Sequence, residues 1–214
     1  MQTKCDKNGR AYIWDLDGTL LDSYGIITES LYETYLECGV EAEREELHRI
    51  AIIDSVTRAL EELSAKTGIS VLELKERYSL ISECRKPDMK MIPGAKEILT
   101  LLAQSGAVHY VYTHRGASTE SVLSALSLTP FFKEVVTAKS GFARKPAPDA
   151  LLYLIDKHQL DPENTYYVGD RTIDMDCAKN AGIKRILFAP PDSYCIPNGS
   201  EQYLVEKLSE IAEI

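Results

Sequence analysis

Two carboxylates separated by one residue follow a short apolar run near the start of the chain. Asp15 and Asp17 come directly after residues 11–14, and Gly18 and Thr19 continue the segment. The apolar run predicts a buried strand that ends at a tight loop. Glycine lets such a loop turn sharply and lets the backbone approach a ligand. Taken alone, the segment could also be a loop whose acidic side chains cap a helix or face water.

Further polar residues follow other apolar runs, at points where separate strands are expected to end. Thr113 follows residues 107–112, and Asp170 and Asp174 follow residues 165–168, while Lys145 precedes a predicted helix. Singly, Thr113 could be an ordinary strand residue and Lys145 a solvated surface charge. The carboxyl ends of parallel strands meet at one edge of a sheet, where ligands bind. The joint arrangement of carboxylates, a hydroxyl and a lysine therefore indicates a functional site.

Strands alternate with helices over most of the chain, which predicts a parallel sheet covered on both faces. We expect strands at residues 11–15, 107–113, 134–137, 165–168 and 185–188. Helices are expected at residues 93–106, 118–128, 148–158, from 170 to 181, and 201–211. The predicted fold class is α/β, a Rossmann-like three-layer core with a parallel sheet.

Residues 23–86 interrupt this alternation with a helical pattern. Apolar residues recur at helical spacing through residues 27–35, 56–63 and 71–81, and Ser70 with Glu73 forms a capping-box sequence before the third helix. We therefore predict an inserted all-helical domain over residues 22–89, with residues 1–21 and 90–214 forming the α/β core. Asp22–Ser23 and Met89–Pro93 would be the chain crossings and hinges.

The chain is acidic, with 33 Asp and Glu against 24 Lys and Arg and a net charge of -9. Residues 22–88 hold 15 of the acidic and 8 of the basic residues, so the predicted insert carries most of this charge. Binding to a phosphate backbone needs a basic face, so we expect no nucleic-acid partner. An acidic protein also repels small phosphates unless a metal ion or placed cations reverse the local field.

The compartment and assembly are predicted from what the sequence lacks. The five cysteines are scattered, odd in number and without a C-x-x-C pair, which argues against a disulfide framework or a structural zinc site. Residues 1–10 are polar and lack the apolar stretch of a secretory signal, and no apolar run approaches the roughly 18 residues of a membrane span. We expect a cytoplasmic protein without a membrane partner. No exposed apolar stripe stands out, so we expect a monomer.

In this order and spacing, the polar segments resemble the motifs of the haloacid dehalogenase-like (HAD) superfamily over nearly the whole chain. The matching residues are Asp15, Asp17, Gly18 and Thr19 for the first motif, Thr113 for the second, Lys145 for the third, and Gly169, Asp170 and Asp174 for the fourth. The helical insert is similar to the alpha-helical C1 cap domain of phosphoglycolate phosphatase-like and beta-phosphoglucomutase-like members.

The resemblance implies a Mg²⁺-dependent phosphatase that hydrolyses a small-molecule phosphate monoester, with a phosphorylated metabolite as its partner. Asp15 would be the nucleophile that forms an aspartyl-phosphate. Asp17 would protonate the leaving alcohol and then activate the water that hydrolyses the intermediate. Thr113 and Lys145 would complete the catalytic residues, the first by donating its hydroxyl to a phosphoryl oxygen, the second by offsetting negative charge.

The same resemblance implies the ligands of the cation and the substrate. Mg²⁺ would be held by Asp15, Asp170 and the backbone carbonyl of Asp17, with Asp174 binding directly or through water. Gly18, Thr19, Thr113 and Lys145 would bind the substrate.

His114 and Arg115 directly follow the expected phosphate-binding hydroxyl. We hypothesise that one or both line the substrate entrance and contact an anionic or hydroxylated part of the substrate. The alternative is a solvated loop.

Other functions remain open within and outside the enzymes. Haloacid dehalogenases lack a carboxylic acid at the position of Asp17, so its presence favours phosphate ester chemistry. A phosphomutase of the beta-phosphoglucomutase type would use the same core residues but return the phosphoryl group to a sugar. A non-catalytic ligand-binding or regulatory module could retain the fold. The sequence does not indicate which phosphate ester is the substrate, because its determinants lie in the cap and loops.

Overall fold

The computed structural model describes residues 9–191 and 193–214. The chain divides into two compact units: an α/β unit, Met1–Leu21 with Met91–Ile214, and a helical unit, Asp22–Lys90. Cys5 and most of the polar N-terminal segment lie outside the described residues. The cysteines within them, Cys38, Cys84, Cys177 and Cys195, form no disulfide. Within the described ranges, each helix is too short or too polar to cross a bilayer.

Six parallel strands form the sheet of the α/β unit, in the order β5-β4-β1-β6-β7-β8. β1 (Ala11–Trp14) lies between β4 (Val108–Tyr112) and β6 (Thr165–Gly169). The outer strands are β5 (Phe132–Val136), β7 (Lys184–Phe188) and β8 (Tyr203–Val205). Each residue of β1 is buried, as expected for a central strand covered on both faces.

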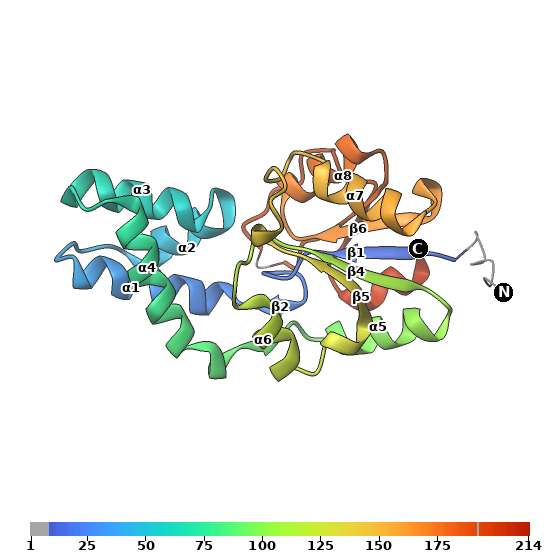
Figure 1. Cartoon of the computed structure of the whole chain (residues 1–214), viewed down its shortest axis with the longest axis horizontal. Helices are drawn as coiled ribbons and strands as arrows, with labels where there is room; N and C mark the ends of the chain where they lie inside the picture. The colour runs from blue at the N-terminus through green and yellow to red at the C-terminus, as the bar shows by residue number, and fades with distance from the viewer. Residues whose placement is uncertain (1–8, 192) are drawn as a thin grey trace. The chain divides into compact units, whose positions relative to one another are not determined.

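Helices cover both faces of this sheet, so the predicted three-layer α/β fold is confirmed. α7 (Asp149–His158) and α8 (Thr172–Ala181) lie on one face, and α5 (Ala95–Gln104) with the C-terminal 3₁₀ segment η5 (Leu208–Glu213) lies on the other (Figure 1). The remaining elements of the unit are α6 (Thr119–Ala125) and the 3₁₀ segments η2 (Thr129–Phe131), η3 (Ala138–Ser140) and η4 (Pro162–Asn164).

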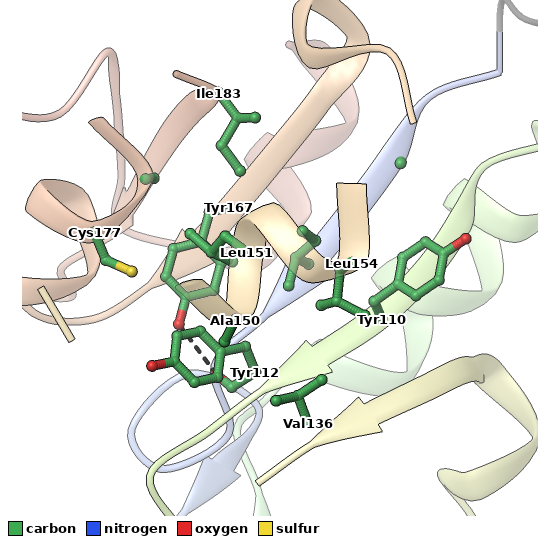
Figure 2. Packing of buried hydrophobic residues seen from close by; sticks show 12 residues of the cluster. Tyr110, Tyr112, Val136, Ala150, Leu151, Leu154, Tyr167, Cys177 and Ile183 are labelled. Atoms are coloured by element: carbon green, nitrogen blue, oxygen red, sulfur yellow. Dashed lines mark hydrogen bonds between the residues drawn. The ribbon is translucent and has the colours of Figure 1, made fainter. Parts of the chain in front are cut away.

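Apolar side chains of the central strands pack against α7 and α8. Figure 2 shows Tyr110, Tyr112 and Tyr167 of the strands beside Leu151 and Leu154 of α7, all of them buried. The packing places α7 and α8 against β1, β4 and β6, and the carboxyl ends of these strands carry the polar residues described below.

The helical unit contains four helices around a core of its own. They are α1 (Tyr24–Glu37), α2 (Arg44–Ile53), α3 (Val56–Thr67) and α4 (Val71–Cys84), followed by the 3₁₀ segment η1 (Lys86–Asp88). The sequence pattern predicted three of these helices and missed α2, whose buried Leu47, Ile50 and Ala51 have the same helical spacing. At the start of α4, Ser70 accepts a hydrogen bond from the backbone N–H of Glu73, as expected for an N-cap.

The predicted C-terminal helix over residues 201–211 is wrong. Tyr203–Val205 forms the short strand β8 beside β7. The last residues, Leu208–Glu213, form the 3₁₀ segment η5. The buried Leu208 and Ile211 are three residues apart, which matches the three residues per turn of a 3₁₀ helix. Tyr and Val also favour a strand over a helix.

Two very short strands mark the points where the chain passes between its units. β2 (Leu21–Asp22) and β3 (Lys90–Met91) pair with each other in a two-stranded sheet. The inserted segment therefore starts and ends at the same ladder.

Candidate active site

The three central strands end level with one another. Trp14, the last residue of β1, is in register with Val111 of β4 and Val168 of β6. Residues just beyond these ends are Asp15, Thr113 and Asp170, and all three are buried. The topology thus places them at the carboxyl edge of the sheet.

The loop after β1 is closed by its own backbone. The carbonyl of Leu16 accepts hydrogen bonds from the N–H groups of Thr19, Leu20 and Leu21, at 2.8–3.2 Å. Gly18 has a φ of 79°, a left-handed conformation that favours glycine. The Thr19 hydroxyl donates to Oδ1 of Asp170 at 3.0 Å, which joins this loop to the end of β6.

Three buried carboxylates form a cluster at this edge. Asp15, Asp170 and Asp174 each offer an oxygen, and these oxygens lie within 4.8 Å of one another. Gly169 makes room for the cluster, because a Cβ atom there would lie 2.5 Å from Cβ and Cγ of Asp174. Hard oxygen ligands at this separation fit a divalent cation such as Mg²⁺.

Lys145 supplies a fully buried positive charge to the same cluster. Its Nζ lies 3.1 Å from Oδ1 of Asp15 and 2.7 Å from Oδ1 of Asp174. The rings of Tyr112 and Tyr167 flank the ammonium group, with centroids 5.0 and 5.3 Å away. Burial alone would lower the pKa of Lys145, but Asp15 and Asp174 raise it above its ordinary value, so the lysine is charged.

The pKa values of the two carboxylates that contact Lys145 are shifted in opposite directions. Burial raises the pKa of Asp15, and the attraction of Lys145 offsets only part of this effect. Burial acts on Asp174 as well, but Lys145 and Arg171 together hold its pKa below the usual range. A divalent cation beside the cluster would favour the ionised form of Asp15.

Asp17 is held by Arg115. The Arg115 Nε lies 3.1 and 3.2 Å from the two carboxylate oxygens of Asp17, and Nη2 also pairs with Oδ1. The Arg115 side chain is 10% exposed and that of Asp17 is 23% exposed. The side chain of Arg115 is therefore not solvated, as the alternative prediction of a solvated loop would require.

The ring of His114 contacts the backbone of Lys145. Nε2 accepts a hydrogen bond of 3.0 Å from the backbone N–H of Lys145. Burial, together with the nearby charges of Lys145 and Arg144, lowers the pKa of His114 to about 3. His114 is thus a neutral side chain that fixes the backbone of Lys145.

Sequence reasoning missed three residues that surround the cluster. The Tyr167 hydroxyl donates to the carbonyl of Tyr112 at 3.1 Å, drawn as a dashed line in Figure 2, and lies 3.4 Å from Oδ1 of Asp174. The backbone N–H of Arg171 donates to the other Asp174 oxygen at 3.1 Å. Tyrosines in strands that are buried on both faces were the available signal, since a buried hydroxyl needs a partner.

This fold and this cluster are those expected of an α/β enzyme whose candidate active site lies at the carboxyl edge of a parallel sheet. A family model for haloacid dehalogenase-like hydrolases matches residues 12–188, and the chain belongs to that family. The prediction of a hydrolase from this superfamily is confirmed.

Curated relatives agree on the type of enzyme. The chain is 28% identical over 214 residues to a phosphoglycolate phosphatase of Mannheimia succiniciproducens, covering 94% of this chain and 96% of the relative. It is 29% identical over 195 residues to a phosphoglycolate phosphatase of Haemophilus influenzae, covering 86% of this chain and 87% of the relative. The prediction of a phosphatase-type enzyme is confirmed at the level of the family.

Solved structures share the fold. A subfamily IA hydrolase of the HAD superfamily from Geobacter sulfurreducens has a TM-score of 0.75 and 27% identity, covering 96% of this chain and 95% of that one. A predicted phosphoglycolate phosphatase from Haemophilus somnus has a TM-score of 0.85, with 21% identity and coverage of 96% of this chain and 97% of that one.

Proposed function

We propose that the chain is a Mg²⁺-dependent phosphatase that hydrolyses a small-molecule phosphate monoester through an aspartyl-phosphate on Asp15. The observation that carries this proposal is the buried cluster of Asp15, Asp170 and Asp174, in which Lys145 pairs with Asp15 and Asp174. Because two relatives of nearly equal length are named phosphoglycolate phosphatase, phosphoglycolate is the first substrate to test.

Asp15, Asp170, Asp174 and the backbone carbonyl of Asp17 would hold the divalent cation. When bound, the cation supplies positive charge beside the phosphoryl group. Lys145 already supplies part of that charge from within the protein. The expected roles of Thr113, Gly18 and Thr19 in holding phosphoryl oxygens belong to this proposal.

The first chemical step joins Asp15 to phosphorus. A carboxylate oxygen of Asp15 attacks, the bond between phosphorus and the ester oxygen breaks, and the electron pair goes to that oxygen. Asp17 gives the leaving oxygen a proton, so an alcohol departs.

The second step restores the enzyme. A water oxygen attacks phosphorus, the bond to Asp15 breaks, and Asp17 accepts a proton from the water. The products are the alcohol and inorganic phosphate, with Asp15 again a carboxylate.

We further propose that the helical insert, predicted over residues 22–89, serves as a cap that selects the substrate. His114 and Arg115 keep their predicted contact with the substrate as a hypothesis. A cytoplasmic monomer without a nucleic-acid or membrane partner likewise stays a prediction.

Release of inorganic phosphate from a panel of phosphate monoesters, phosphoglycolate included, tests the proposal. We expect turnover with Mg²⁺, no turnover with a chelator, and none by the Asp15→Asn variant. Asp176→Asn is the matched control, since Asp176 lies on α8 like Asp174 but bonds to the Ser200 hydroxyl. Equal turnover by wild type and Asp15→Asn would contradict the mechanism. Return of the phosphoryl group to a sugar would favour the phosphomutase.

A further inference from the structure

We propose that Arg115 is the positioning residue of Asp17: its guanidinium fixes the orientation of the Asp17 carboxylate. The inference rests on the proposed function, since it assigns Asp17 the role of acid and base. It gives Arg115 a role through another residue, as the alternative to the direct contact with the substrate that the sequence suggested.

The main chain of Asp17 is already fixed by the closed loop after β1. Asp17 forms a β-bridge with Leu21, and the N–H of the next residue, Gly18, donates to the carbonyl of Leu21 at 2.9 Å. The freedom left to Asp17 lies in its side-chain torsions. Those torsions decide where the carboxyl group meets the substrate.

The backbone of Arg115 is anchored on both sides. Its N–H donates to the Thr113 hydroxyl at 3.1 Å, and its carbonyl accepts from the N–H of Ala138 at 3.2 Å. Nη1 donates to the hydroxyl of Ser118 at 3.2 Å. The main-chain hydrogen bonds of Arg115 and the contact of Nη1 with Ser118 therefore restrain the guanidinium independently of Asp17.

The contact between the two side chains fixes a plane rather than a single point. Nε lies within hydrogen-bond distance of both oxygens of Asp17, and Nη2 pairs with one of them. A planar guanidinium that binds a carboxylate through two nitrogens restricts its rotation, which a point charge such as lysine does not do. Since 10% of the Arg115 side chain is exposed, solvent has little access to compete.

Placement matters here because a misplaced acid loses much of its effect. If Arg115 acts through Asp17, the cost of removing it in the first step depends on how much the leaving group needs a proton, whereas its cost in the second step is the same for every ester. An alkyl ester needs the proton, because an alkoxide is a poor leaving group. An aryl ester with a stable phenolate, such as p-nitrophenyl phosphate, does not.

The test compares Arg115→Met with wild type on phosphoglycolate, or on the best alkyl phosphate of the panel, and on p-nitrophenyl phosphate. We expect kcat/KM, which reports formation of the aspartyl-phosphate, to fall by about 10–100-fold on the alkyl ester, part of what general acid catalysis contributes, and by less than about threefold on the aryl ester. Arg115→Lys should restore only part of the loss, because lysine keeps the charge without the fork.

Two further variants complete the experiment. Arg144→Met is the matched control, because exposed Arg144 lies next to Lys145 in sequence and its removal takes away a positive charge without touching the Asp17 contact. It should change both substrates by the same small factor. In Asp17→Asn, adding Arg115→Met should cost nothing more, as expected for two residues that act as one unit.

Equal losses of kcat/KM on the alkyl and aryl esters, a loss confined to KM, or additive losses in the double variant would each overturn the inference and indicate direct substrate contact. Thermal denaturation of each variant shows whether the fold is retained, and Arg115→Lys carries the comparison if Arg115→Met does not fold. Failure of the proposed function has a different signature: wild type then hydrolyses neither ester, or Asp15→Asn hydrolyses as well as wild type.

Discussion

Gly169 shows how closely a single residue fits the acidic cluster. It ends β6 directly before Asp170, and the side chain of Asp174 occupies the space where a Cβ atom would be. Asp174 in turn contacts Lys145 at 2.7 Å and is fully buried, so its neighbours restrict any displacement of its side chain.

We therefore predict that Gly169→Ala displaces Asp174 and lowers the free energy of unfolding by about 1–3 kcal/mol, the usual cost of overpacking. Phosphatase activity should fall with it, because Asp174 is a proposed ligand of the cation. Gly116→Ala is the control, since a Cβ there meets no atom within 4 Å and its φ is not left-handed. Denaturant unfolding of the two variants checks this, and equal stabilities would contradict it.

At the scale of single residues, the grouping of the polar residues at one edge of the sheet was predictable, but the contact between Asp17 and Arg115 was not. Asp15, Thr113 and Asp170 could be placed together because each follows a predicted strand. The contact of Asp17 with Arg115 joins residues 98 positions apart. It depends on how two loops orient their side chains, and no local pattern encodes that.

Among the elements, β5 and α7 are joined by a cluster of polar side chains. Glu134 of β5 accepts hydrogen bonds from Lys157 at 2.9 Å and from Tyr153 at 2.8 Å, and its other oxygen lies 2.7 Å from Nε2 of His158. Burial would raise the pKa of Glu134, but these three partners lower it to about 2.

Because the folded-state pKa of Glu134 lies below the unfolded value of about 4.3, the cluster stabilises the fold above that pH. This contribution is lost as the pH falls from about 4.3 towards 2. Solvent screens charges at the surface, so we expect about 1 kcal/mol at pH 7. Urea unfolding of wild type and Glu134→Gln should show this difference at pH 7 and a smaller one at pH 3. A difference that stays constant over this range would contradict the assignment.

Most elements with a clear period were predictable, although α2 was missed, and the C-terminal segment and the two-residue strands were not. The central strands and α5, α7 and α8 follow from apolar runs and helical spacing. The C-terminal segment offered too few residues to separate a strand and a 3₁₀ turn from a helix, and its contacts with β7 and α5 decided the outcome. β2 and β3, with two residues each, exist because they pair with one another.

Over the whole molecule, the net charge of -9 describes the helical unit more than the active site. Residues 22–88 carry a net charge of -7, whereas the carboxylates of the candidate site belong to the α/β unit. The acidic composition therefore does not oppose a phosphate ligand. Lys145 and a bound cation would set the charge that the ligand meets.

We predict that Mg²⁺ raises the thermal unfolding temperature of the wild type, because it binds the folded cluster and not the unfolded chain. At 100 times the dissociation constant the gain is about 2.7 kcal/mol. Asp170→Asn should lose this gain and Asp176→Asn should keep it. Hydrogen exchange should locate the protection in the α/β unit, since the candidate ligands Asp15, Asp170 and Asp174 all belong to it. An equal gain in Asp170→Asn would refute the site.

The pairing of β2 with β3 has a consequence for how such proteins diversify. Both ends of the 69-residue helical unit lie in one two-stranded ladder, so the unit is an insertion with a single junction to the α/β unit. Its core is built from its own helices, and the strands that carry the candidate site pair without it. Such an insertion can be replaced by another one at the same junction without changing the strands of the sheet. If the helical unit selects the substrate as proposed, recombination at this junction changes the specificity and leaves the proposed reacting groups unchanged.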